Sequence, residues 1–158
     1  MIRKKILLLG DFHVGKTSLI RRYVDNSFDD SYLTTIGVKI SKKQITLDGE
    51  AYELLIWDIE GATPQKRIPQ SYFRGASGAI FVADVGREET IEHLAVHLED
   101  FRSVNPNAAY VTAYNKADLL TPVQQKNFAL ESSGFLTSAK EDMNVEALFE
   151  TLARRMLG

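Results

Sequence analysis

The segment from Gly10 to Ser18, GDFHVGKTS, constrains the fold of this chain more than any other part of its sequence. It matches the pattern Gly-x4-Gly-Lys-Ser/Thr of a phosphate-binding loop, and it follows the apolar run from Ile6 to Leu9. In such loops a buried strand turns sharply into a helix, because successive backbone N–H groups and the positive helix N-terminus together bind phosphate oxygens. The motif therefore predicts a strand, a phosphate-binding loop and a helix in that order. By itself it leaves open a plain glycine-containing turn with a chance lysine.

Two side chains of this loop carry the expected chemistry. Lys16 would reach the β- and γ-phosphates of a triphosphate, and the hydroxyl of Thr17 would bind Mg²⁺. Gly10 and Gly15 allow the backbone to approach the phosphates where a Cβ would obstruct it. A nucleoside triphosphate with its magnesium ion is thus the ligand class that the loop predicts.

Length and composition narrow the remaining possibilities. At 158 residues, 44% of them hydrophobic, the chain has the size and apolar content of one domain, residues 1–158. Its 19 Lys and Arg against 21 Asp and Glu give a net charge of −2, so neither nucleic acid nor an anionic lipid surface is an expected partner. The sequence has no cysteine, which excludes disulfides, thiolate metal sites, a nucleophilic thiol and a lipid carried on Cys.

No apolar run is long enough for a signal-peptide core or a membrane span. We therefore expect a cytoplasmic protein with no direct membrane anchor, which reaches membranes only through partners. Two explanations of the missing lipid site stay open: the natural protein is not lipidated, or a lipid-bearing tail lies outside this sequence.

Apolar periodicity predicts alternating strands and helices along the chain. The expected strands are Ile6 to Leu9, Val38 to Leu47, Tyr52 to Ile56, Ala79 to Ala83, Ala108 to Ala113 and Phe135 to Thr137. The expected helices are Thr17 to Val24, Gln65 to Tyr72, Ile91 to Phe101, Pro122 to Leu130 and Val145 to Met156. This order favours an α/β fold with a doubly wound, mostly parallel six-stranded sheet. The turn signal Asp48-Gly49 predicts a hairpin, and hence one antiparallel edge strand.

A second group of candidate residues follows the apolar strand that ends at Trp57. Asp58 there could hold a Mg²⁺-bound water opposite Thr17, and Gly61 leaves a backbone N–H for a γ-phosphate. The hydroxyl of Thr35 could close over the same ion. Taken alone, Asp58-x-x-Gly61 could be a plain turn and Thr35 a plain surface residue.

A third group indicates which base is bound. Asn115-Lys116-Ala117-Asp118 follows an apolar strand, and the Asp118 carboxylate can accept hydrogen bonds from both N1–H and the amine of guanine, which adenine cannot offer. Lys116 can lie across the base, and the segment Ser138-Ala139-Lys140 can supply a backbone N–H to the guanine oxygen. Alone, the first segment could be a solvated turn. In this order and spacing with the phosphate-binding loop, the three groups together predict a guanine nucleotide site.

These motifs together resemble those of small GTPases of the Ras superfamily, with the Rab-type branch the nearest in pattern. The resemblance covers essentially the whole chain. The residues that carry it are Gly10 to Thr17, Thr35-Ile36-Gly37, Trp57-Asp58 with Gly61, Tyr72 to Ala76, Asn115-Lys116-x-Asp118 and Ser138-Ala139-Lys140.

The resemblance implies a small G domain of the P-loop NTPase fold that binds GTP or GDP with Mg²⁺ and hydrolyses GTP. The implied nucleotide-binding residues are His13, Val14, Gly15, Lys16, Thr17, Ser18, Phe28, Tyr32, Thr35, Gly61, Asn115, Lys116, Asp118, Ser138, Ala139 and Lys140. The implied metal ligands are Thr17, Thr35 and Asp58, and the implied catalytic residues are Lys16, Thr35 and Gly61. Effectors, exchange factors and activating proteins would bind through switch segments 28–40 and 60–74. A Rab-like partner surface would use Ile40, Trp57 and Tyr72, although Ile40 replaces the usual aromatic residue.

Four residues depart from the family pattern. Ala62 stands where the family has a glutamine that orients the attacking water, and a methyl group cannot do this. Phe12 and His13 replace small residues of the phosphate-binding loop, and Phe12 could obstruct an arginine from an activating protein. Glu60 brings an acid beside the γ-phosphate. We expect slow hydrolysis. In the competing account, His13, Glu60 or Thr63 orients the water instead.

Two other classes of function share part of this pattern. A non-catalytic module could hold one nucleotide for structural reasons and act by docking partners. A phosphoryl-transferring kinase would share the phosphate-binding loop, but Asn115-Lys116-x-Asp118 and the lack of an evident acceptor site disfavour it.

Overall fold

The computed structural model describes residues 1–28, 37–59, 61 and 66–157. Within these residues six strands form one sheet in the order β2-β3-β1-β4-β5-β6. The strands are β1 Ile2–Gly10, β2 Val38–Leu47, β3 Glu50–Ile59, β4 Ala76–Asp84, β5 Ala109–Asn115 and β6 Gly134–Leu136. The helices are α1 Lys16–Asp25, α2 Glu88–Glu92, α3 Leu94–Val104, α4 Pro122–Asn127 and α5 Val145–Leu157, with 3₁₀ turns at Gln70–Tyr72 and Ala117–Leu119.

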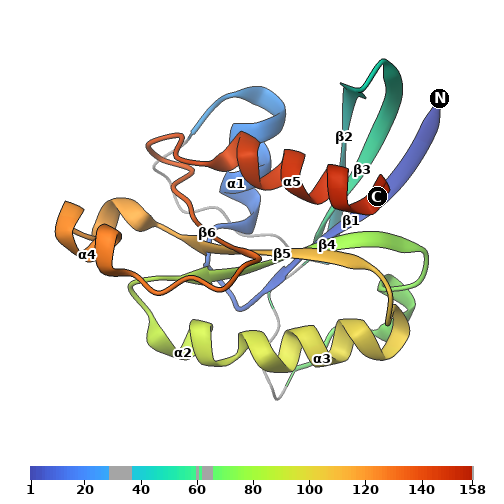
Figure 1. The fold of residues 1–158 in the computed structure, drawn as a ribbon. Coiled ribbons are helices and arrows are strands. Elements are labelled where there is room, and N and C mark those ends of the chain that lie inside the picture. The colour runs from blue at the N-terminus through green and yellow to red at the C-terminus, as the bar shows by residue number, and fades with distance from the viewer. Residues whose placement is uncertain (29–36, 60, 62–65, 158) are drawn as a thin grey trace.

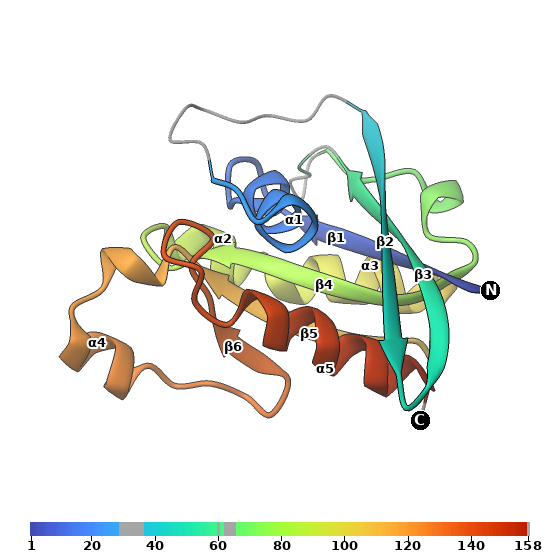
Figure 2. The same ribbon diagram turned by 90° about the horizontal axis from the view of Figure 1, so that it is seen from above.

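The sheet has the mixed topology expected from the sequence. β1 lies parallel to both β3 and β4, β4 to β5 and β5 to β6, whereas β2 is antiparallel to β3. The β2–β3 turn has φ of 51° at Asp48 and 83° at Gly49, and two positive values suit the tight hairpin turn that an Asp-Gly pair favours. Figure 2 shows this hairpin along one side of the molecule and α4 at the other. The predicted doubly wound α/β sheet with one antiparallel edge strand is thereby confirmed.

Helices cover both faces of the sheet: α1 and α5 lie on one face, and α2 and α3 on the other (Figure 1). Side chains alternate along β1, so Ile6 and Leu8 join the core under α1 and α5, while Leu7 and Leu9 join the core under α3. Both faces of β1 are therefore buried, which explains why its sequence is a continuous apolar run.

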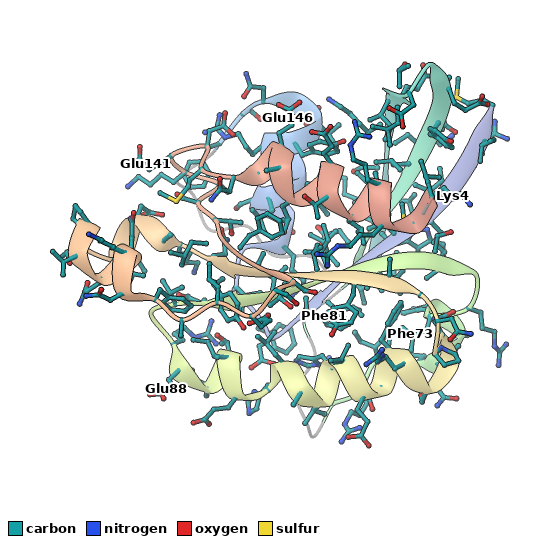
Figure 3. The ribbon with its side chains drawn as sticks, in the orientation of Figure 1. Lys4, Phe73, Phe81, Glu88, Glu141 and Glu146 are labelled. Atoms are coloured by element: carbon teal, nitrogen blue, oxygen red, sulfur yellow. The ribbon has the colours of Figure 1, made fainter. Side chains whose placement is uncertain are left out.

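Aromatic rings fill the second of these cores. Phe73 and Phe81 lie between the sheet and α3 (Figure 3), and each meets the ring of Phe101 edge-on, with centroids 6.0 and 5.8 Å apart. Phe101 is fully buried on α3. The side of the sheet that carries α3 is thus held by aromatic packing as well as by aliphatic side chains.

Three predicted helices differ in extent from those observed. Of the expected helix Gln65 to Tyr72, the described part after residue 65 contains only the 3₁₀ turn Gln70–Tyr72, which follows Pro69. The expected helix Ile91 to Phe101 is two helices, α2 and α3, that meet at His93. α4 ends at Asn127 instead of Leu130, because Phe128 is extended and its ring packs against Tyr114. Among the described helices, none has the length and apolar character that crossing a membrane requires.

Candidate functional site

The candidate site lies at the edge of the sheet where the parallel strands end, which is where α/β sheets of this type bind ligands. β1 ends at Gly10 and the next helix begins at Lys16, after Gly15 with φ of 101°. The Lys16 ammonium donates to the carbonyl oxygens of Gly10 at 3.1 Å and Asp11 at 2.8 Å. The loop thus folds around the ammonium group of its own lysine.

Lys16 is buried, which disfavours its charged form. Burial lowers the pKa of this ammonium to about 8, although the nearby carboxylates of Asp58 and Asp11 raise it and Arg87 lowers it further. A bound polyphosphate would supply negative charge at this position and favour the protonated lysine.

Thr17 and Asp58 meet directly, although they lie on different elements. The Thr17 hydroxyl, on α1, donates to Asp58 Oδ2 at 2.6 Å, and Asp58 is buried near the end of β3. A hydroxyl and a carboxylate oxygen are the hard donors that Mg²⁺ prefers. The donor set that the sequence predicted for a magnesium ion is therefore brought together, as far as its described members go.

The third predicted group is joined to the phosphate-binding loop by the side chains of Asn115, the last residue of β5, and of Lys116, which follows it. Asn115 Nδ2 donates to the Val14 carbonyl at 3.0 Å, and its Oδ1 accepts from the Thr137 hydroxyl at 3.0 Å. Lys116 Nζ donates to the His13 carbonyl at 2.8 Å and pairs with Asp84 at 2.9 Å. These contacts fix the distance between the part of the site expected to bind phosphate and the part expected to bind the base.

Asp118 faces the segment Ser138 to Lys140. The Ser138 hydroxyl donates to Asp118 Oδ1 at 2.7 Å and accepts from the backbone N–H of Glu141 at 3.0 Å. Ser138 and Ala139 are buried, and Lys140 is exposed. Asp118 is therefore oriented by a hydroxyl from a different loop, next to the backbone expected to meet the guanine oxygen.

Arg22 holds the same segment from α1, and sequence reasoning missed it. Its Nε donates to the Ala139 carbonyl at 2.8 Å and its Nη2 to the Lys140 carbonyl at 3.1 Å. The only signal in the sequence is a basic residue in the last turn of a helix, which ordinarily indicates no more than a favourable interaction with the helix dipole.

The remaining predicted residues fall into two groups. Phe28 is half-buried and packs against the core under α1 and α5, Ser18 lies in the first turn of α1, and a Cβ on buried Gly61 would meet the backbone of Phe12 at 2.6 Å. Gly61 thus lies against the phosphate-binding loop, as expected for the second group of candidate residues. Tyr32 and Thr35 lie outside the described residues, as do Glu60, Ala62 and Thr63.

The arrangement is that of three separate loops gathered on one strand-to-helix turn. The model of the Ras family matches residues 5–158 of the chain. The chain belongs to the Ras family. Membership makes this Ras-family protein a GTP-binding molecular switch with the fold of a small G domain. Ras-family proteins bind GTP or GDP with Mg²⁺, and the oxygen donors of Thr17 and Asp58 fit that ion.

A cluster of three side chains in this Ras-family protein was not predicted. The Asp11 carboxylate is buried and meets His93 Nδ1 at 2.5 Å and His97 Nε2 at 2.7 Å. Arg87, just before α2, donates to the Phe12 carbonyl at 2.8 Å. The two histidines are four residues apart, about one helical turn, and this spacing is the sequence signal that could have indicated the pair.

Proposed function

We propose that this Ras-family protein is a Rab-like guanine-nucleotide switch of the cytoplasm that hydrolyses GTP slowly and acts in signal transduction. The observation that carries the proposal is the joining of the three loops: Asn115 and Lys116 bond to the phosphate-binding loop, and Asp118 is oriented by Ser138. This geometry supports the binding of one ligand that reaches from the residues expected to bind guanine to the phosphate-binding loop.

In the proposed reaction, water attacks the γ-phosphorus of GTP in line with the departing GDP, and the chain contributes position and charge. Lys16 and the backbone N–H groups of His13 to Ser18 would hold the β- and γ-phosphates. Thr17 and Asp58, with Thr35, would hold Mg²⁺, which when bound offsets negative charge on the phosphate oxygens. The backbone N–H of Gly61 would bind the γ-phosphate. Each group stabilises negative charge on the phosphate oxygens as the bond between the γ-phosphorus and the departing GDP breaks.

Two features favour a slow rate. Ala62 supplies no group to orient water, and Phe12 stands in the loop facing the second switch, where its ring lies 5.8 Å from Lys66 Nζ. An aromatic ring here fills space that an activating protein's arginine would need. The competing account keeps His13, Glu60 or Thr63 as the group that orients water. His13 has φ of 63°, a strained conformation for a residue with a Cβ, and its ring lies beside that of Phe12.

Single-turnover hydrolysis tests this proposal. With GTP and ATP compared side by side, we expect binding of GTP alone and a slow release of phosphate from it. Ala62→Gln should accelerate that release by at least tenfold, since the amide restores a group that can hold water. Phosphate release by the unaltered chain at an ordinary small-GTPase rate would overturn the slow-hydrolysis proposal, and equal binding of ATP would overturn the guanine site.

The second candidate is a non-catalytic module that keeps its nucleotide and works by docking partners. Ala62 favours this candidate as well, because its methyl group cannot orient the attacking water. Nucleotide released from the purified protein by denaturation distinguishes the two: GDP or a mixture indicates turnover, whereas GTP that persists through a long incubation indicates the module.

Partners would bind through segments 28–40 and 60–74. Of the three residues proposed for a Rab-like surface, Ile40 is 48% exposed, whereas Trp57 and Tyr72 are half-buried and join the core under α3. Tyr72 also lines a cleft of about 260 Å³, together with Gly37 and Pro69. Tyr72 therefore has both a core side and a side open to a partner, and Ile40 offers the most exposed apolar contact of the three.

A further inference from the structure

The carboxylate of Asp11 is buried in the loop that is expected to bind polyphosphate. Its side chain is 5% exposed, and it places an acidic group beside the position where phosphates would lie. A buried carboxylate needs donors, because removing a charge from water is costly. Both oxygens find one: Oδ2 meets His93 Nδ1 and Oδ1 meets His97 Nε2.

The chemistry of these contacts fixes which way the protons point. An ionised carboxylate only accepts, so each imidazole donates from the nitrogen that faces Asp11, and neither ring needs a positive charge to do so. Within the described residues, no group of three His, Cys, Asp or Glu side chains is placed to hold a metal ion. The cluster is therefore a hydrogen-bonded anchor that ties the phosphate-binding loop to α2 and α3.

The anchored residue also holds Lys16. The Asp11 carbonyl accepts from Lys16 Nζ at 2.8 Å, so the side chain and the backbone of one residue connect the histidines to the lysine expected to bind phosphate. Arg87 holds the next carbonyl, that of Phe12, at 2.8 Å. Two consecutive residues of the loop are thus fixed from the same face of the sheet.

We propose that His93 and His97 are positioning residues for nucleotide binding: by holding the Asp11 carboxylate, they keep the phosphate-binding loop and Lys16 in the conformation that accepts the β-phosphate. This inference rests on the proposed nucleotide site. Without a donor, the carboxylate would move toward water and take the backbone of residue 11 with it. If the competent fraction of loop conformations then falls to about a tenth, the apparent affinity for nucleotide falls about tenfold.

His97→Phe tests the proposal, because it keeps a ring of similar size and removes the donor. Affinities are measured on the full chain by competition of GDP and of GMP against a fluorescent guanine nucleotide. We expect GDP to bind about tenfold more weakly, while GMP, which lacks the β-phosphate, changes less than about twofold. His97→Gln, whose amide N–H can replace the ring donor, should restore most of the GDP affinity.

A matched control separates anchoring from general weakening of α3. Leu98 is half-buried on the same helix and packs into the core under it. Leu98→Ala should lower the unfolding free energy and leave GDP binding within about twofold, as it removes core contact without touching Asp11. His93→Leu, at the partly exposed position, is a second test should His97→Phe not fold, with the same selective loss of GDP affinity.

Three outcomes would overturn the inference: unchanged GDP affinity in both histidine variants, equal losses for GDP and GMP, or a loss in Leu98→Ala as large as that in His97→Phe. Failure of the proposed function is recognised separately, since the unaltered chain would then bind no guanine nucleotide at all.

Discussion

Gly15 shows at the scale of one residue why the phosphate-binding motif requires glycine. Its φ of 101° is unfavourable for a residue with a side chain, and a Cβ built on it would lie 2.3 Å from Asn115 Nδ2. That amide donates to the Val14 carbonyl. The space over Gly15 is therefore filled by the residue that joins the Asn115–Asp118 segment to the phosphate-binding loop. The requirement is therefore one of both backbone conformation and space.

Gly15→Ala should displace Asn115 and abolish tight nucleotide binding, with a loss of stability on the order of 2 to 4 kcal/mol from strain and broken buried hydrogen bonds. Gly49 provides the control, because its φ is 83° but a Cβ there would meet nothing within 4 Å. Gly49→Ala should cost about 1 to 2 kcal/mol in strain alone and leave nucleotide binding unchanged. Urea unfolding and GDP titration of both variants check this, and similar nucleotide affinities would contradict it.

At the scale of elements, the proposed base site depends on α1 as much as on the loops that carry its motifs. Arg22 reaches from α1 to two consecutive carbonyls, those of Ala139 and Lys140. A planar guanidinium on two acceptors fixes both position and orientation. The helix that follows the phosphate-binding loop thereby also supports the segment expected to meet the guanine oxygen.

Arg22→Met should accelerate GDP release roughly fivefold to tenfold, since a charged hydrogen-bond donor is removed from the supporting loop. The neighbouring Arg21→Met is the control, because Arg21 also lies on α1 and none of the described contacts joins it to that loop. Release of a fluorescent GDP analogue measures both rates. An analogue that lacks the guanine 6-oxygen should be released at nearly the same rate from Arg22→Met as from the unaltered protein. An equal acceleration for both ligands would argue against a role at the base.

At the scale of the whole molecule, the cluster of Asp11 with His93 and His97 links stability to pH. Burial lowers the pKa of His97 below its usual 6.5, although the hydrogen bond and charge of Asp11 act in the opposite direction. The nearby Lys16 and His93 also lower it. The folded protein therefore holds this ring neutral at a pH where the unfolded chain would protonate it.

Because the unfolded state binds the extra proton, the stability that neutral His97 contributes is fully present above pH 6.5 and declines as pH falls below it. Urea unfolding at a series of pH values from 8 to 5, a range chosen to bracket this transition, should show the decline. His97→Gln, which cannot titrate, should show a shallower one. Identical slopes in the two proteins would exclude His97 as the source.

Much of the fold and of the candidate site could be predicted from local sequence, because the determining interactions are local or periodic. The apolar run of β1, the Asp48-Gly49 turn and the motif from Gly10 to Ser18 each specify backbone conformation within a few residues. The helix ends were less predictable. α4 ends where Phe128 becomes extended and packs against Tyr114. The local sequence of α4 does not predict this contact.

The sequence by itself determined the strand–loop–helix unit, the six-stranded sheet and the residues with the chemistry for a guanine nucleotide. Only the tertiary structure decided what supports them. Asp11 meets histidines 82 and 86 residues away, and Arg22 meets carbonyls 117 and 118 residues away. Each partner is an ordinary polar residue in its local sequence. A buried charge finds its hydrogen-bond partners only after the sheet and helices have packed, so no local pattern records which residues these will be.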